Sequence, residues 1–513
     1  MEDKIEPHIH HEGDEGEIET KVVGGHEAFQ KAMIQDPPYA WSRGQLFIYL
    51  FSLVGFLCST MNGYDGSLIN NLLQNPWFRE KYGVDNSGIW AGIVSSMYQI
   101  GGVVALPFVG PVIDGFGRRW GMFSGAALIV VGTVIQGLSH NAAESSGIPW
   151  TSMYNTLWFS GAIVAAGSAR AGLNTGGDYS WRLITWLQAL CSGLIMITSL
   201  FLPESPRWLY VHNKLDAAKS VLTHYHGNGN PDSPWVKLQL SEYEEALNMD
   251  GADKRWWDYR VLFRDRAAVY RLCCNLAVSI FSQWAGNAVL SYFLGAVLDT
   301  AGYTGTIEQA NITLINYCQQ FALAILGACL VDRLGRRPLL IFSFAACTVV
   351  WLGMTIASSE FAKSYVGDDS KGDPIYTNQA ASKAALALVF IFGAVFSFGI
   401  TPLQALYPVE VLSFEMRAKG MAFSNLAVNA AGLLNQFAWP VAMDKIAWKT
   451  YIIFTIWDLV QVVLIYIYLP ETKGRTLEEL DEIFAAQNPV KASTQKKVLA
   501  VSKDGGVVNL EKV

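Results

Sequence analysis

The stretch GPVIDGFGRR, residues 110–119, decides the fold, because a near-copy, VDRLGRRP at residues 331–338, recurs in the second half of the chain. Each copy joins two long apolar runs. Each half then closes on a further shared signature, PESPRWL from Pro203 and PETKGRTLEEL from Pro470. Internal duplication with two parallel halves is how large helical membrane folds are built. The sequence therefore predicts two similar helical bundles.

Composition places the chain in a membrane. Of its 513 residues, 51% are hydrophobic and only 16% are charged, against roughly 25% charged in a soluble domain. The net charge of -7 argues against a nucleic-acid partner. The seven cysteines lie in apolar stretches without metal-ligand spacing, so we expect neither a disulfide framework nor a metal site: Cys58, Cys191, Cys273, Cys274, Cys318, Cys329 and Cys347.

Eleven apolar runs approach the roughly 20 residues that a membrane-spanning helix needs. Approximate spans are 46–66, 88–109, 120–138, 154–173, 182–202, 273–298, 312–331, 338–358, 384–406, 421–441 and 449–469. They divide the chain into a disordered cytosolic tail (1–45), an N-terminal bundle (46–202), a cytosolic linker (203–272), a C-terminal six-helix bundle (273–469) and a cytosolic tail (470–513). Within the linker, LDAAKSVL and EYEEAL predict short helices.

The repeat also measures a deficit in the first half. From Asp114 to Pro203 is 89 positions (203 − 114), whereas from Asp332 to Pro470 is 138 (470 − 332). The difference of 49 corresponds to one helix of roughly 20 residues with its connecting loop. Part of the excess belongs to a longer loop in the second half. The polar join QGLSHNAAESSGIPW, residues 136–150, lies where the extra helix would be expected.

Six motifs in order carry a family resemblance: DGFGRR, PESPRWL, QWAGNAVLSYF, DRLGRRP, YPVEVLSFEMRAKG and PETKGRTLEEL. Together they resemble the sugar porters of the major facilitator superfamily. MNGYDGSL and LAVNAAGLLNQFAWPV are similar to its fungal branch of lactose permease-like and hexose transporters. The resemblance covers about residues 40–485 and implies an all-α membrane protein with the two-bundle major facilitator fold. Family members have twelve transmembrane helices, whereas eleven are predicted here, without the fourth.

The resemblance implies a latch of acids and arginines at the cytosolic helix ends. Arginine rather than lysine suits bidentate pairing with carboxylates. The implied latch residues are Asp114, Arg118, Arg119, Glu204, Arg207, Asp332, Arg336, Arg337, Glu410, Arg417, Glu471 and Arg475. Alternatively, these arginines only mark the cytosolic side of the membrane.

Asp65, in NGYDGSL near the outer end of the first span, is the most informative ionisable residue. A carboxylate at membrane depth is costly and indicates a proton or ion relay. The resemblance implies proton coupling, since proton-linked sugar porters carry this acid, although the arginine that pairs with it on the fourth span is not found. The alternative is a solvated acid at a frayed helix end. Asp458, in the last span, is interpreted as structural or interfacial.

A sugar site requires hydrogen-bonding side chains in a cavity between the bundles. The residues predicted to contact the sugar are Gln283, Asn287, Tyr292, Gln320, Asn425 and Asn429. Gln283 and Asn287 are four apart and so share one helical face, and the resemblance supports these two and Asn425. The alternative is hydrogen bonding between helices. Ala405 stands where many sugar porters have a tryptophan, which favours a roomier pocket and a disaccharide.

Eleven spans conflict with the rule that basic segments face the cytosol. Counted simply, they place the basic linker outside the cell. If the usual orientation is kept, residues 139–153 cross the membrane in extended form, which leaves backbone groups unsatisfied. We therefore expect a destabilised N-terminal half with a groove in place of the fourth helix. A skipped or wrongly assigned exon or a true isoform would explain it.

The leading expectation is a carbohydrate:proton symporter, a multi-pass protein of the plasma membrane that works by alternating access. Its partners would be a small sugar, either a hexose or a disaccharide such as lactose or cellobiose, together with protons and the lipid bilayer. The alternatives are a sugar sensor that does not transport and an inactive truncated product. The sequence shows no nucleophile and base pair, metal cluster or phosphate-binding loop, so neither enzymatic activity nor a cofactor is expected. The oligomeric state is unknown.

Overall fold

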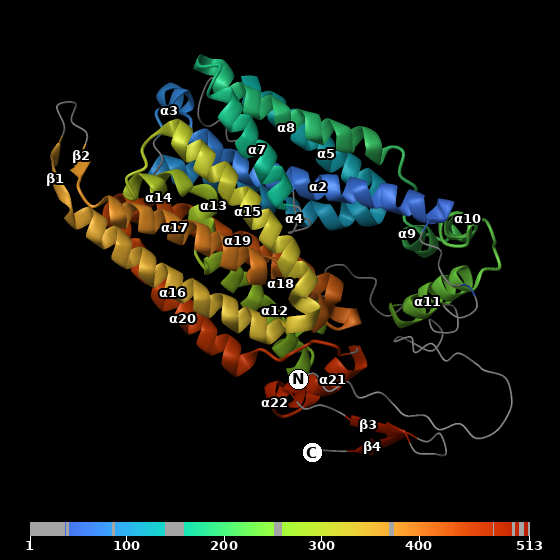
Figure 1. The fold of residues 1–513 in the computed structure, drawn as a ribbon. Coiled ribbons are helices and arrows are strands. Elements are labelled where there is room, and N and C mark those ends of the chain that lie inside the picture. The colour runs from blue at the N-terminus through green and yellow to red at the C-terminus, as the bar shows by residue number, and fades with distance from the viewer. Residues whose placement is uncertain are drawn as a thin grey trace.

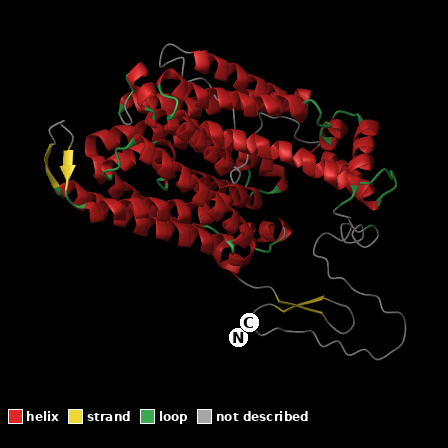
Figure 2. Cartoon of the chain, turned by 45° about the horizontal axis from the view of Figure 1, so that its top comes forward, coloured by secondary structure: helices red, strands yellow, loops and turns green. Residues whose placement is uncertain are grey.

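The computed structural model describes residues 36, 41–84, 88–138, 158–250, 259–368, 374–475, 477–494, 498–501 and 507–510. These residues are almost entirely helical (Figure 2). Two short antiparallel strand pairs complete them: β1 (Tyr365–Asp368) with β2 (Pro374–Tyr376), and β3 (Val498–Val501) with β4 (Val507–Leu510). The predicted tail 1–45 lies almost wholly outside the described residues.

The long helices gather into two groups (Figure 1). In the N-terminal bundle α2 packs against α7, and α5 packs against α8. Its helices are α2 (Arg43–Gln74), α3 (Pro76–Tyr82), α4 (Ile89–Phe116), α5 (Arg118–Leu138), α7 (Trp158–Gly172) and α8 (Gly177–Ser199).

The C-terminal bundle repeats this pairing, since α12 packs against α19 and α16 against α20. Its elements are α12 (Arg266–Trp284), α13 (Asn287–Tyr292), α14 (Leu294–Thr300), α15 (Thr306–Leu334), α16 (Arg336–Lys363), α17 (Gln379–Val395), the π-helical turn η2 (Phe396–Ile400), α18 (Thr401–Val411), α19 (Phe414–Ile446), η3 (Ala447–Lys449) and α20 (Thr450–Tyr468). By this pairing α7 corresponds to α19 and α8 to α20. The C-terminal bundle has α17, η2 and α18 between α16 and α19. Among the described residues, nothing corresponds to them between α5 and α7.

Short helices cluster at one end of the two bundles, which we call the linker end (Figure 1). They are α9 (Pro206–Val211), α10 (Leu215–Tyr225), α11 (Pro234–Asp250), η1 (Tyr259–Phe263), α21 (Leu477–Ala485) and α22 (Pro489–Thr494). The helices predicted from LDAAKSVL and EYEEAL are confirmed in α10 and α11. The opposite end, which we call the far end, carries α3, α14 and the β1–β2 pair. Buried Arg271 of α12 joins α21 to the C-terminal bundle through an ion pair with Asp481 (2.5 Å).

Seven helical stretches of the described residues are long and apolar enough to cross a membrane. They are Arg43–Gln74, Arg118–Gln136, Gly177–Ser199, Thr306–Leu334, Arg336–Lys363, Gln379–Val411 and Lys419–Tyr468, the last of which contains both α19 and α20. Large apolar side chains face outward, among them Val349 (68% exposed) and Ile456 (60%), as expected for helices surrounded by lipid. The predicted number of crossings remains a prediction.

The first long helix extends beyond its predicted end. The apolar run suggested a span to residue 66, but α2 continues to Gln74 and buries every residue from Met61 onward. The last two turns of α2 are rich in asparagine and glutamine. Because these turns pack inside the protein, they do not need apolar side chains. Asn75 then ends α2 and caps α3, accepting hydrogen bonds from the backbone N–H groups of Trp77 (3.1 Å) and Phe78 (3.3 Å). Asp65 thus lies within a buried helix rather than at a frayed end.

Two glycines bring α2 and α7 into close contact. A Cβ atom at Gly63 would clash with the Trp158 backbone, and one at Gly161 would clash with the Thr60 backbone. Small residues at helix crossings let backbones approach closely, and in lipid such packing replaces the hydrophobic driving force. This contact fixes α7 in the N-terminal bundle.

We predict that Gly63→Ala lowers the free energy of unfolding by about 1–3 kcal/mol, because the added methyl group overpacks a backbone contact. Thermal unfolding of the purified protein in detergent measures the change. Gly55→Ala is the matched control on the same helix, since nothing lies within 4 Å of its added Cβ. Equal stability of the two variants would contradict the close contact.

Candidate functional site

The first helix of the C-terminal bundle is broken where the sugar site was predicted. Helix α12 ends at Trp284, Gly286 adopts φ 93°, and α13 begins at Asn287. A Cβ atom at Gly286 would clash with the Trp351 ring, and the Trp351 indole donates to the carbonyl of Ala285 (3.0 Å). Residues 273–298 were predicted as one span, but they form the later part of α12, all of α13 and most of α14. Discontinuous helices of this kind often line binding sites in membrane proteins.

The break separates the predicted residues Gln283 and Asn287. Both side chains are half-buried. The Asn287 amide oxygen accepts a hydrogen bond from the Ser291 hydroxyl (3.2 Å). The backbone carbonyl of Gln283 accepts from Asn435 of α19 (2.7 Å), so α19 holds the residue in place. The side chains are positioned at a helix break, but they no longer share the face of one continuous helix.

Two other predicted residues contact glycines on neighbouring helices. Asn429 of α19 lies against Gly102 of α4, which belongs to the other bundle. Gln320 of α15 lies against Gly393 of α17 and accepts a hydrogen bond from Ser397 (3.4 Å) within its own bundle. Their surroundings show packing between helices, and sugar contact by either remains a prediction. Asn425 is half-buried, and its backbone carbonyl accepts from Asn429 (2.8 Å).

The predicted Tyr292 belongs to a polar cluster that joins the two bundles. Its hydroxyl faces the amides of Gln99 on α4 and Gln436 on α19. Gln436 is fully buried, and apart from the Tyr292 hydroxyl its amide faces no hydrogen-bond partner among the described residues. Gln99 lies against Gly432 of α19, which mirrors the contact of Asn429 with Gly102. We name Gln99, Tyr292 and Gln436 the interbundle cluster.

Sequence analysis missed Gln99, although a signal was present. An amide within an apolar span is costly unless it finds a partner, and Gln99 is the amide of the predicted span 88–109. The motifs that indicate a sugar site lie in the C-terminal bundle, whereas Gln99 lies outside every such motif. Only the structure shows that α4 and α19 are neighbours.

Asp65 contacts the last helix of its bundle. The Gln188 side-chain nitrogen of α8 donates to Asp65 Oδ1 at 2.5 Å, and the carboxylate is only 3% exposed. The preceding Tyr64 donates to the carbonyl of Ile184 (2.6 Å), which fixes α2 against α8 one turn from this contact. Trp158 of α7 packs next to Gly66 on the other side. The acid is therefore enclosed by α2, α7 and α8.

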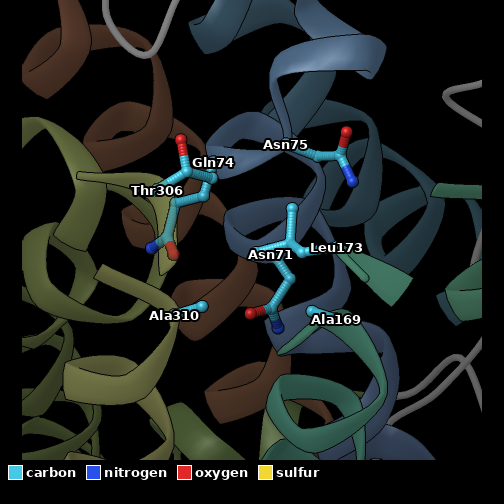
Figure 3. A pocket seen from close by; sticks show the side chains of 7 residues that line it. All are labelled: Asn71, Gln74, Asn75, Ala169, Leu173, Thr306 and Ala310. Atoms are coloured by element: carbon cyan, nitrogen blue, oxygen red, sulfur yellow. The ribbon is translucent and has the colours of Figure 1, made fainter. Parts of the chain in front are cut away.

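At the far end the two bundles are linked by polar contacts. Gln74 of α2 donates to Thr313 of α15 (3.3 Å), and Arg170 of α7 donates to Asn311 of α15 (2.9 Å). Figure 3 shows the small hollow beside the first of these contacts, lined by Asn71, Gln74, Asn75, Ala169, Leu173, Thr306 and Ala310. This end of the molecule is packed closed.

The two GRR loops at the linker end form the same structure twice. One glycine with positive φ, Gly117 (99°) or Gly335 (91°), separates the helix that ends from the helix that begins. Glu204 accepts from the backbone N–H of Arg118 (2.9 Å). Glu471 accepts in the same way from the backbone N–H groups of Arg336 (3.0 Å) and Arg337 (3.1 Å).

This arrangement corrects the predicted chemistry of Glu204 and Glu471. We expected them to pair with arginine guanidinium groups, but they cap helix N-termini. The first N–H groups of a helix have no partner inside it, and the helix dipole favours a negative charge there. Each glutamate therefore ties the end of its bundle to the start of α5 or α16.

One ion-pair network of the predicted kind occurs in the C-terminal bundle. The Arg336 side chain is 9% exposed and contacts Glu410 (2.7 Å) and Asp332 (2.9 Å). Glu410 also accepts from the Thr472 hydroxyl (2.5 Å). Glu410 lies on α18, an element with no counterpart among the described residues of the N-terminal bundle. Arg118 of that bundle is exposed.

The remaining predicted latch residues lie at the same end with other contacts. The Arg337 guanidinium donates to the carbonyl of Tyr466 (2.7 Å), and that of Arg475 donates to the carbonyl of Ser493 (3.3 Å). Arg119 stacks over Trp120, and Arg417 is half-buried. Nothing is described of the Asp114 side chain.

Arg207 and Arg118 lie near Tyr243 of the linker helix α11. Burial raises the pKa of the Tyr243 phenol, while the two arginines lower it. The linker helix α11 therefore lies near the GRR loop of the N-terminal bundle.

Comparison with known proteins identifies the architecture. A sequence model of the family described as "Sugar (and other) transporter" matches residues 51–148 and 149–484. A high-affinity glucose transporter from Kluyveromyces lactis is 28% identical over 488 residues, which cover 86% of each chain. Myo-inositol transporter 2 from Cryptococcus neoformans is 25% identical over 479 residues, covering 85% of this chain and 83% of the relative.

Solved structures confirm the predicted two-bundle fold. The proton:xylose symporter XylE of the major facilitator superfamily, bound to 6-bromo-6-deoxy-D-glucose, matches with a TM-score of 0.68 at 18% identity. The match covers 86% of this chain and 100% of that one. The partially occluded inward-open form of XylE from E. coli matches with a TM-score of 0.65 at 18% identity, covering 84% and 99% of the two chains.

We predict that Glu410→Ala lowers the free energy of unfolding by about 3 kcal/mol, because it leaves the buried Arg336 charge without its main partner. Thermal unfolding in detergent measures the loss. Glu360→Ala is the control, since it removes an exposed pair with Lys363 and should change stability by less than about 1 kcal/mol. Similar losses in both variants would show that the Arg336 network does not support the bundle.

Proposed function

The chain belongs to the sugar transporter family, and from this membership we propose that it carries a hexose or a disaccharide across the plasma membrane together with protons. It is a multi-pass membrane sugar transporter of the major facilitator superfamily and not an enzyme. Its relatives are named as glucose and myo-inositol transporters. Among the expected substrates a hexose has this support, while lactose and cellobiose rest on the sequence resemblance alone.

The interbundle cluster is the observation that carries the proposal. Gln99 comes from the N-terminal bundle, whereas Tyr292 and Gln436 come from the C-terminal bundle. A fully buried amide whose hydrogen-bonding capacity is only partly used is costly, and a bound polar molecule that supplies the missing partners offsets the cost. A sugar presents several hydroxyl groups that both donate and accept. Sugar bound between Gln283, Asn287 and this cluster would contact both bundles at once.

Movement between the bundles follows from where their contacts lie. The polar contacts of Gln74 and Arg170 close the far end, and the α4–α19 contact extends from Gly88 with Pro440 to Gly102 with Asn429. The glutamate caps at the linker end lie within single bundles. Opening and closing at the two ends in turn would expose the cluster to each side, as alternating access requires.

We assign the linker end to the cytosol. Arg118, Arg119, Arg336 and Arg337 all lie at that end, and positively charged residues favour the cytosolic side of a membrane. Both tails and the linker 203–272 would then face the cytosol, as the sequence predicts.

Asp65 is the proposed proton site. It is buried at membrane depth, on the helix that packs against α7 and α8 and also contacts α13. The Gln188 amide donates to one of its oxygens and can do so whether the acid is ionised or protonated, because a carboxyl group keeps an acceptor oxygen in both forms. Asp65 can therefore bind and release a proton while its hydrogen bond to Gln188 is kept.

The missing fourth helix remains part of the proposal. The two segments matched by the family model meet at residues 148 and 149, within the polar join. Helix α5 ends at Leu138 and α7 begins at Trp158, and residues 139–157 lie outside the described residues. Since α7 packs against both α2 and α15, as α19 packs against both α12 and α4, it corresponds to a fifth helix. An inactive truncated product is the alternative that this gap favours, and a sugar sensor without transport is the other.

We predict that Asp65→Asn abolishes the pH dependence of labelled-glucose accumulation while sugar binding is retained, because asparagine keeps the hydrogen bond to Gln188 but binds no proton. Uptake into cells without other sugar transporters measures accumulation at several pH values. Asp444→Asn, at an exposed acid of α19, is the control. Unchanged pH-dependent uptake would remove Asp65 from the mechanism.

We also predict that the full transcript contains about 40 further codons between residues 139 and 153, enough for one helix of roughly 20 residues and its loop. Sequencing of full-length transcripts provides the test. A chain carrying the insertion should be more stable in detergent than the 513-residue chain. Transcripts that only ever lack the insertion, together with sugar uptake by the 513-residue chain, would contradict the proposal.

A further inference from the structure

The C-terminal bundle contains a buried carboxyl group that plays no part in the proposed mechanism. Asp458 lies in the middle of α20 and is 0% exposed. Its Oδ2 atom has no hydrogen-bond partner among the described residues. An ionisable group at membrane depth is costly and by default indicates a functional site. The sequence suggested a structural or interfacial acid, and the position of Asp458 in the middle of α20 argues against the interfacial one.

A glutamine one turn away is the polar neighbour of Asp458. In one orientation of its amide, the Gln461 side chain forms two hydrogen bonds. Its nitrogen donates to Asp458 Oδ1 (3.3 Å), and its oxygen accepts from the Trp457 indole (2.5 Å). Trp457 packs edge-on against Phe281 and Trp284 of α12, with ring centroids 6.4 Å and 5.7 Å away. Phe281 and Trp284 lie near the end of α12, just before the break at Gly286, so Trp457 links the surroundings of Asp458 to the helix that breaks.

The helices around Asp458 provide no compensating positive charge. Helix α20 packs against α12, α16, α19 and η3. Among the described residues, the titratable group that faces Asp458 from these elements is the buried Cys347 thiol of α16. A buried carboxylate without a cation is strongly disfavoured, whereas the protonated acid carries no charge and gains an O–H donor. These surroundings therefore suit a carboxyl group that holds a proton.

The internal repeat relates the position of Asp458 to that of a residue near Asp65. Asp458 lies 12 positions before Pro470 (470 − 458), and Cys191 lies 12 positions before Pro203 (203 − 191). Cys191 in turn lies close enough to Asp65 for the two side chains to interact electrostatically. Each bundle therefore holds a buried acid beside a glutamine of its last helix, Gln188 next to Asp65 and Gln461 next to Asp458.

We propose that Asp458, held by Gln461, is a second proton-binding site in the C-terminal bundle. The Asp458 carboxylate takes up one proton to form the neutral acid and returns it as a proton, with no other bond changed. Only the role of this proton in transport rests on the proposed symport. The binding of the proton follows from the burial and the partners of Asp458 alone.

Infrared difference spectroscopy of the purified full chain in lipid nanodiscs tests proton binding directly. The wild-type protein should show a carbonyl stretching band of a buried protonated acid that Asp458→Asn removes and Asp458→Glu shifts. Asp444→Asn, the exposed acid of α19, should leave the band unchanged. A wild-type spectrum identical to that of Asp458→Asn would overturn the proposal. If Asp458→Asn does not fold, the band shift in Asp458→Glu decides the result.

Proton and sugar fluxes in proteoliposomes test the role of the site, with labelled glucose as the probe. Asp458→Asn should lower the number of protons taken up per sugar while Asp65 remains in place. An unchanged ratio would show that Asp458 does not exchange its proton during transport and would contradict this role. Absence of any proton flux in the wild-type protein, with the infrared band present, would refute the proposed symport and leave the second site standing.

Discussion

Two carboxylates, Glu204 and Glu471, provide the contact on which each bundle depends. Each caps the N-terminus of a helix that is separated from the preceding helix by a single glycine. The N–H groups there have no partner inside the helix, and the helix dipole favours a negative charge beside them. The joints at Gly117 and Gly335 require glycine because φ is positive and because a Cβ would press on the capping carboxylate. The second, third and last helices of each bundle are thus held as one unit.

Contacts between the bundles are of a different kind. Along α4 and α19, amides lie over glycines on the facing helix, with Gln99 against Gly432 and Asn429 against Gly102. Small residues let these two backbones approach closely, so the surfaces of α4 and α19 can separate and meet again. The same zone holds the buried amide of Gln436, for which a sugar hydroxyl would provide a partner. Rigidity within bundles and adaptability between them are what transport by alternating access requires.

The repeat and the ordered motifs were sufficient to predict the family and the two-bundle fold, because motifs that end helices are local in sequence. These signals were not sufficient to predict the contacts between helices that are distant in the sequence. The first span was predicted to end at residue 66, because the buried amides that follow are typical of a loop sequence. The break at Gly286 was not predicted because the sequence around it stays apolar. The role of Gln99 was not predicted because its contact, Gly432, is 333 positions away (432 − 99). Glu204 and Glu471 were predicted to pair with arginine side chains, but they cap backbone N–H groups, and such partners carry no sequence signal.

The central claim is that sugar passes between the two bundles. Counterflow into proteoliposomes that contain only the purified chain tests it most directly. Vesicles preloaded with unlabelled glucose should accumulate labelled glucose transiently above its outside concentration, because one alternating site exchanges sugar on both faces. Labelled glucose that binds to the protein but never enters the vesicles would contradict the account.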